Sequence, residues 1–118
     1  MDESITFEKS IQFGVRMIRF AEFLIEKKQR VIADQILRSG TSIGANIAEG
    51  KYAASKADFI NKNKIAEKEA NETAYWLKLL KAAEIVDEKQ YESLFADLHE
   101  LQCLIGATII TAKSRTTK

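Results

Sequence analysis

Proline is absent from the 118 residues of the chain, and only five residues are glycine. Because proline interrupts helices and marks tight turns, a chain without it lacks the usual punctuation of β-hairpins and long loops. Long helices can therefore run without interruption. The 46% of hydrophobic residues can also bury a substantial core. These features favour an all-α fold in a single domain over residues 1–118, since domains typically hold about 100–150 residues.

The apolar pattern predicts four helices, at about residues 5–28, 31–52, 56–83 and 88–113. Two of the predicted starts carry N-cap signatures, in which a side-chain oxygen accepts a hydrogen bond from an amide of the first turn. Ser55 stands three residues before Asp58, and Asp87 stands three before Gln90, which is the spacing of a capping box. Because joins of a few residues make consecutive helices antiparallel, the prediction is an up-down-up-down four-helix bundle.

The helix predicted at residues 5–28 carries two apolar stripes, although an isolated bundle needs only one. We expect the first stripe to face the core; it comprises Phe7, Ile11, Gly14, Val15, Ile18, Ala21 and Ile25. The second stripe, well round the helix, comprises Phe13, Met17, Phe20 and Leu24. Extra apolar surface of this kind commonly marks an interface. The sequence therefore predicts a homo-oligomer that assembles through the second stripe, and the alternative is a wide core face in a monomer.

The helix predicted at residues 88–113 adds a smaller apolar line beside its main seam. The members of this line are His99, Cys103, Gly106 and Ile110, and we expect Cys103 and Ile110 to contribute to the oligomer interface. His99 and Cys103 supply at most two metal ligands and have no identified orienting group, so neither a metal site nor a catalytic role is predicted. A single cysteine cannot form an internal disulfide, which favours a reduced, cytoplasmic protein, and no membrane span is expected.

Small and polar residues crowd the middle of the helix predicted at residues 31–52. Two glycines lie four residues apart there, which indicates the close approach of another backbone. A polar ladder runs beside the apolar stripe, and its members are Gln35, Ser39, Ser42 and Asn46. Buried polar groups need partners. We therefore expect a structural polar network with the next helix, in which Arg38 meets Glu69 or Glu72 in a partly buried contact.

The formal net charge is +1, far below the basicity of a protein whose binding is dominated by phosphate neutralisation. Contact with nucleic acid would therefore need a local patch. In an up-down-up-down bundle the second join and the C-terminus lie at the same end, where Lys62 and Lys64 also fall. The cations of this end that we expect to contact RNA or DNA are Lys51, Lys56, Lys113 and Arg115. A scaffold that binds only protein is the alternative, and a ring would repeat either surface in every subunit.

The sequence supplies no coherent set of catalytic residues and no cofactor motif. A di-iron bundle needs two Glu-x-x-His pairs, whereas this chain has one histidine, with Ala96 three positions before it. Gly40 and Gly44 lie within a helical pattern and lack the strand-turn-helix context of a phosphate-binding loop. We therefore expect a protein that is not an enzyme and that uses no cofactor or metal.

Three segments are long and distinctive: SGTSIGANIAEG at residues 39–50, KADF at 56–59 and IAEKEANETAYWLKLL at 65–80. They resemble the four-helix bundle proteins of the 23S rRNA intervening-sequence family. The resemblance implies an antiparallel bundle that assembles into a homopentamer, a bacterial origin and no established enzymatic activity. It also implies kinship with the accessory variability determinant of diversity-generating retroelements, a strongly basic pentamer that binds nucleic acid and a reverse transcriptase. The expected function is that of an adaptor or scaffold.

Overall fold

The computed structural model describes residues 3–115, with side chains from residue 5 onward, so residues 1–2 and 116–118 of the predicted domain lie outside the described residues. Residues 3–115 form helices and no strand. The helices are α1 (Glu3–Glu26), α2 (Arg30–Lys51), α3 (Lys56–Ala82) and α4 (Glu88–Arg115). Every bound lies within two residues of its predicted position. The all-α prediction is therefore confirmed.

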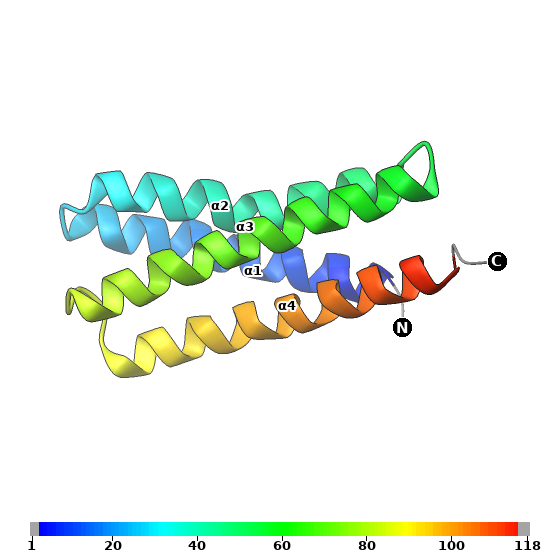
Figure 1. Ribbon diagram of the computed structural model, residues 1–118. Helices are drawn as coiled ribbons and strands as arrows, with labels where there is room; N and C mark the ends of the chain where they lie inside the picture. Colours follow the sequence, from blue (N-terminus) through cyan, green and yellow to red (C-terminus); the bar gives the residue numbers. More distant parts are fainter. Residues whose placement is uncertain (1–2, 116–118) are drawn as a thin grey trace.

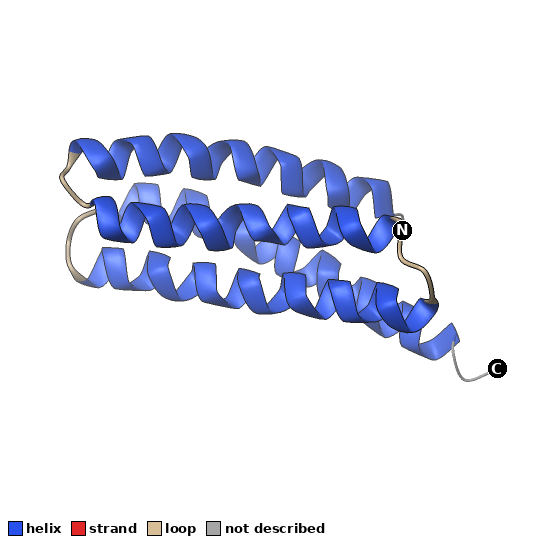
Figure 2. Cartoon of the chain, turned by 90° about the horizontal axis from the view of Figure 1, so that it is seen from above, coloured by secondary structure: helices blue, strands red, loops and turns tan. Residues whose placement is uncertain are grey.

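The helices run antiparallel, each to the one before it, in an elongated bundle that measures 52 × 22 × 19 Å (Figure 1). The α1–α2 and α3–α4 turns share one end, and the α2–α3 turn shares the other end with the start of α1 and the end of α4 (Figures 1 and 2). α2 packs against α1 and α3, and α4 packs against α3, whereas the contact between α1 and α4 is less extensive. This topology is the predicted up-down-up-down bundle.

Side-chain caps fix the starts of α3 and α4. The amide of Asp58 donates to Ser55 Oγ at 3.1 Å, and the amide of Gln90 donates to Asp87 Oδ1 at 2.7 Å. Each bond satisfies an amide that has no partner within its own helix, which is what the capping-box spacing predicted. α2 begins after Gln29, which makes no side-chain capping bond.

The ends of α1 and α3 rely on left-handed residues that are not glycine. Lys28 has a φ of 63° and Glu84 a φ of 62°. After Lys28, the amide of Gln29 donates to the carbonyl of Leu24 at 2.9 Å, which is the long bond of a Schellman motif. Glycine usually occupies the left-handed position of this motif, so the sequence gives little warning of either end.

The core runs the length of the bundle and draws on all four helices. Its wholly buried side chains include Met17, Leu24, Ile36, Ile43, Leu77, Leu80, Leu98 and Ile105. The glycines of α2 let α1 approach closely, as predicted. A Cβ atom on Gly40 would lie 2.5 Å from Met17 Cγ, and one on Gly44 would lie 2.9 Å from Ser10 Oγ.

Candidate functional site

The two apolar stripes of α1 have exchanged the roles predicted from the sequence. The α1 residues predicted to form the oligomer interface lie in the protomer core instead, since Phe13, Met17, Phe20 and Leu24 are all buried. The two stripes have the same helical period, so periodicity could not choose between them. Side-chain size distinguishes the two stripes. Two phenylalanines, a methionine and a leucine bury a large apolar area, whereas the other stripe contains a glycine, which has no side chain to bury. The glycine at position 40 of α2 also leaves room for Met17.

The stripe predicted to face the core therefore lies largely at the surface. Ile11 is 52% exposed, Val15 49% and Ile18 45%, whereas Ala21 is buried and Phe7 is half-buried. We call Ile11, Gly14, Val15, Ile18 and Ile25 the α1 stripe, in which Gly14 is half-buried and the other residues are exposed. Around Gly14, a Cβ atom would meet nothing within 4 Å in the protomer. The α1 stripe is thus an apolar, uncovered face of the protomer.

A second uncovered face lies on α4, and we call it the α4 face. It consists of Ala96, His99, Cys103, Gly106, Ala107 and Ile110. Ile110 is 70% exposed, and a Cβ atom on Gly106 would meet nothing within 4 Å. The apolar content of α4 suffices, by length and composition, for a membrane-spanning helix, but its main seam lines the core of this bundle. The α4 face accounts for apolar residues that the core does not use.

The α1 stripe and the α4 face lie on different sides of the bundle. α1 meets α4 through Lys9, whose Nζ is 3.2 Å from Glu100 Oε2, and through Arg16, whose Nη1 is 2.8 Å from Asp97 Oδ2. At about 100° per residue, Ile18 points roughly 160° away from Arg16. Ile18 therefore faces away from α4, whereas Val15 lines a hollow with Gln90 and Leu94 of α4, neither of which belongs to the α4 face.

Cations gather at the end of the bundle that contains the α2–α3 turn. Lys51 and Lys56 flank this turn, and Lys113 and Arg115 lie in the last turn of α4, all four exposed. Lys51 Nζ lies 4.7 Å from the centre of the Phe7 ring. Nearby, Lys62 Nζ pairs with Glu49 Oε1 at 3.0 Å, and the hydrogen bond and charge of that carboxylate raise the pKa of Lys62.

Arg38 spans two glutamates of α3. Its Nη1 lies 3.3 Å from Glu69 Oε1, and its Nη2 contacts Glu72 Oε2. The indole nitrogen of Trp76 donates to the same Glu72 oxygen at 3.0 Å. This arrangement fixes the position of α2 relative to α3, because the guanidinium holds two carboxylates one turn apart.

The polar ladder of α2 divides into residues that reach α3 and residues that do not. Ser39 Oγ lies 2.8 Å from Thr73 Oγ1 in the buried core, a partner that the sequence analysis missed. Ser42 and Asn46 instead donate to carbonyls one turn back in their own helix, at 2.7 and 2.9 Å. Gln35 is half-buried one turn before Ser39. Only part of the expected ladder therefore crosses between the helices.

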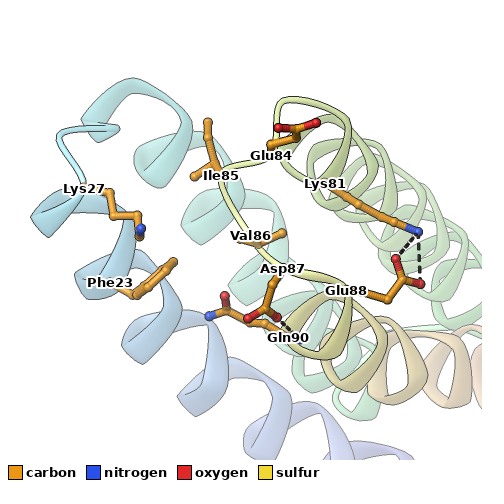
Figure 3. A pocket seen from close by; sticks show the side chains of 9 residues that line it. All are labelled: Phe23, Lys27, Lys81, Glu84, Ile85, Val86, Asp87, Glu88 and Gln90. Carbon is orange, nitrogen blue, oxygen red and sulfur yellow. Dashed lines mark hydrogen bonds and ion pairs between the residues drawn. The ribbon is translucent and has the colours of Figure 1, made fainter.

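A cavity of about 600 Å³ opens at the end of the bundle that contains the α1–α2 and α3–α4 turns (Figure 3). Its lining residues are Phe23, Lys27, Lys81, Glu84, Ile85, Val86, Asp87, Glu88 and Gln90. Lys81 Nζ pairs with Glu88 Oε1 at 3.0 Å. A hydrogen bond with Glu92 and the ammonium of Lys81 lower the pKa of Glu88, while the bond to Glu88 raises the pKa of Glu92. None of the nine lining residues is a serine, threonine, cysteine or histidine that could act as a nucleophile.

Potential metal ligands are sparse in the described part of the chain. Cys103 Sγ lies 3.6 Å from His99 Nε2 on the exposed side of α4. Within residues 3–115, no group of three or more His, Cys, Asp or Glu side chains could hold a metal ion. The pair supplies two ligands, fewer than the three or four protein ligands of most zinc sites.

These features define an all-α, up-down-up-down bundle whose candidate functional regions are surfaces. The chain belongs to the 23S rRNA-intervening sequence protein family, whose family profile matches residues 2–107. The resemblance to this family noted in the sequence is thereby confirmed.

The chain is also similar to a crystallised protein of unknown function from Bacteroides thetaiotaomicron, described as a member of the S23 ribosomal protein family. The two share 50% sequence identity with a TM-score of 0.91, over 92% of this chain and 98% of the other. No curated protein matches the chain. Neither the family nor this structural relative indicates an enzyme class.

Proposed function

We propose that the protein is a non-enzymatic scaffold that assembles in the cytoplasm into a homo-oligomeric ring. The observation that carries the proposal is the α1 stripe, in which three aliphatic side chains are each about half exposed in the folded protomer. Burying an aliphatic side chain fully contributes about 1.5–3 kcal/mol, so covering the exposed half of each of three contributes roughly 2–4 kcal/mol together. Contiguous apolar surface of this kind typically marks an interface.

Two glycines support a partner that is another protein backbone. Gly14 and Gly106 each lie inside a helix, where glycine costs about 0.8–1.0 kcal/mol relative to alanine. Neither makes room for anything within its own protomer. A second helix that approaches closely at these positions would give both glycines a role.

The separation of the two apolar faces supports a ring. Contact between the α1 stripe of one copy and the α4 face of the next joins two different surfaces, which is a heterologous contact. Heterologous contacts close into rings when the rotation between neighbours permits it. We propose a homopentamer on the family resemblance.

The test of assembly is the molar mass in solution. Light scattering of the wild type is compared with Val15→Glu/Ile18→Glu, which places two charges in the α1 stripe. Leu79→Glu is the matched control, because Leu79 is 36% exposed on α3, outside both apolar faces. We expect a multimer for the wild type and the control and a folded monomer for the double variant. A wild type that stays monomeric at high concentration would contradict the proposal.

We further propose that the ring contacts RNA or DNA through its repeated basic end. This proposal is supported by the grouping of Lys51, Lys56, Lys113 and Arg115 at one end of the bundle. Weak contacts that repeat around a ring add up through avidity. Phosphate contacts weaken steeply as salt rises, whereas an apolar docking surface does not. Binding of a partner that persists at high salt would favour the second candidate, a scaffold that binds protein alone, which the near-neutral net charge supports.

A further inference from the structure

The seam between α1 and α4 is only partly closed by polar contacts. Lys9 and Arg16 of α1 make the ion pairs and hydrogen bonds that join the two helices. Beyond Arg16, toward the α1–α2 turn, no hydrogen bond or ion pair joins α1 to α4 among residues 3–115. The seam is therefore open to a ligand in this part of the bundle.

Two hollows lie in this part of the seam. The first is the cavity of about 600 Å³ described above, which we call the turn-end cavity. The second, which we call the seam hollow, measures about 280 Å³ and is lined by Val15, Arg16, Arg19, Phe20, Phe23, Gln90 and Leu94. Phe23 and Gln90 border both hollows, so a ligand that contacts these two side chains can occupy both. Small-molecule sites typically measure about 300–1,000 Å³, so the space suffices for a small ligand.

Two hydrogen-bond donors without an acceptor stand beside Phe23 at the junction of the hollows (Figure 3). Lys27 Nζ lies 5.3 Å from the centre of the Phe23 ring and pairs with no carboxylate among residues 3–115. The side-chain amide of Gln90 has no hydrogen-bond partner in the described part of the chain. An ammonium and an amide can both donate to one carboxylate, so the junction matches an anionic head group.

The other cations that line the hollows already have carboxylate partners. Lys81 pairs with Glu88, Arg16 with Asp97, and Arg19 with Glu22. Among the described residues, Lys27 is thus the cation of the two hollows that remains for an anion from outside the chain.

The carboxylates that border the turn-end cavity do not favour a cationic ligand over an anionic one. Glu88 is held by Lys81, and Asp87 Oδ1 accepts from the backbone amide of Gln90 at 2.7 Å. Glu84 is exposed in the α3–α4 turn. The charge that remains without a partner beside Phe23 is therefore the positive charge of Lys27.

We propose that the two hollows together form a binding site for a fatty acid. Lys27 and Gln90 hold the carboxylate beside Phe23, and the acyl chain lies in the seam hollow against Phe20 and Leu94. Phe20 comes from α1 and Leu94 from α4, so the chain would fill the seam between the two helices. This site goes beyond the proposed scaffold function and depends neither on assembly nor on contact with nucleic acid.

The first arm of the test locates the ligand on the wild-type protein. Sodium decanoate is titrated below its micelle concentration while methyl groups are followed by NMR. We expect the methyl resonances of Leu94 to shift, with those of Leu79 on α3 and Ile110 on α4 as exposed references outside the hollows. Absence of a shift at Leu94, or equal shifts at all three residues, would overturn the site.

The second arm tests the head group by calorimetry. Decanoate, decanol and decyltrimethylammonium share one chain and differ in charge, and we expect decanoate to bind most tightly. Because Lys27 is exposed, Lys27→Gln should weaken decanoate by up to about fivefold, the upper end for an exposed ion pair, and should leave decanol unchanged. Lys89→Gln is the matched control, since Lys89 is an exposed cation at the same end that lines neither hollow. Equal affinity of the wild type and Lys27→Gln for decanoate would overturn the assignment of the head group.

The third arm tests the acyl chain by its length. Octanoate, decanoate and dodecanoate carry the same head group, and each methylene that becomes buried should raise the affinity by up to about fourfold. An affinity that does not rise from octanoate to decanoate would show that the chain stays in water, and it would overturn the assignment of the seam hollow.

Discussion

Replacing Gly14 and Gly106 by alanine should change the stability of the protomer and the affinity of an assembly in opposite directions. Each glycine lies in the middle of a long helix, and neither has a protomer atom within 4 Å of the position of an added Cβ. In the isolated protomer the new methyl group therefore meets no neighbour. The helix gains from alanine because its backbone has less freedom to lose on folding.

The expected gain can be worked out from helix propensity. Alanine is about 0.8–1.0 kcal/mol more favourable than glycine inside a helix, so the double variant should gain about 2 kcal/mol. The two sites are on separate helices and share no partner, so their effects should add. In an assembly that uses close helix contact at these positions, each methyl would instead overpack the interface at a cost of about 1–3 kcal/mol.

The assay measures both quantities in matched backgrounds. Free energies of unfolding come from urea denaturation in the Val15→Glu/Ile18→Glu background, where we expect only the protomer to contribute. Molar mass against dilution is followed in the wild-type background. We expect Gly14→Ala/Gly106→Ala to stabilise the protomer and to dissociate the assembly at higher concentrations. Gly40→Ala is the control with the opposite sign, because its methyl would collide with the buried Met17.

Two results would refute this reasoning. An assembly that tolerates both alanines without loss of affinity would show that no second helix approaches at these glycines. A protomer that gains no stability from them would show that the glycines serve the fold of the single chain, contrary to the open space around them.

Three further predictions test other features. Arg38→Met should lower the free energy of unfolding by about 1 kcal/mol, because it removes the cation shared by two half-buried carboxylates of α3; an unchanged urea midpoint would show that the contact adds nothing to stability. Thr6→Val should raise the free energy of unfolding by about 1 kcal/mol, since Thr6 Oγ1 is buried without a hydrogen-bond partner among the described residues; a loss of stability would contradict this. By NMR, Glu88 should titrate below and Glu92 above the ordinary glutamate range. Glu88 therefore adds stability that is lost as the pH falls through its folded pKa, and Glu92 has the opposite sign. Glu88→Gln should return Glu92 to the ordinary range, and a persistent shift would refute their coupling.

The helices were predictable from the sequence because local rules specify them. Without proline, the apolar period runs through each segment unbroken, and the caps at Ser55 and Asp87 mark two starts. The ends of α1 and α3 were less visible, because Lys28 and Glu84 adopt a left-handed conformation that sequence signals assign to glycine. Tertiary packing holds Lys28 and Glu84 in this conformation, and a local sequence pattern does not reveal tertiary packing.

The surfaces were harder to predict than the helices. Charged groups could be placed at the correct end, because topology alone determines which turns and termini lie together. Pairings across helices depend on register, which the sequence does not state. The contact of Ser39 with Thr73 follows from register, and the sequence analysis did not pair these two residues.

The exchange of the two α1 stripes changes which variants can test assembly. Truncating a buried aromatic such as Phe13 costs about 3–5 kcal/mol, a large share of the total stability of about 5–15 kcal/mol that domains of this size have. Loss of the oligomer in Phe13→Ala would therefore follow from unfolding of the protomer and would say nothing about an interface. Ile18→Glu changes a side chain that is 45% exposed and leaves the packing of Met17 on α2 intact. Only variants of this second kind can attribute a change in molar mass to the surface through which copies of the chain would meet.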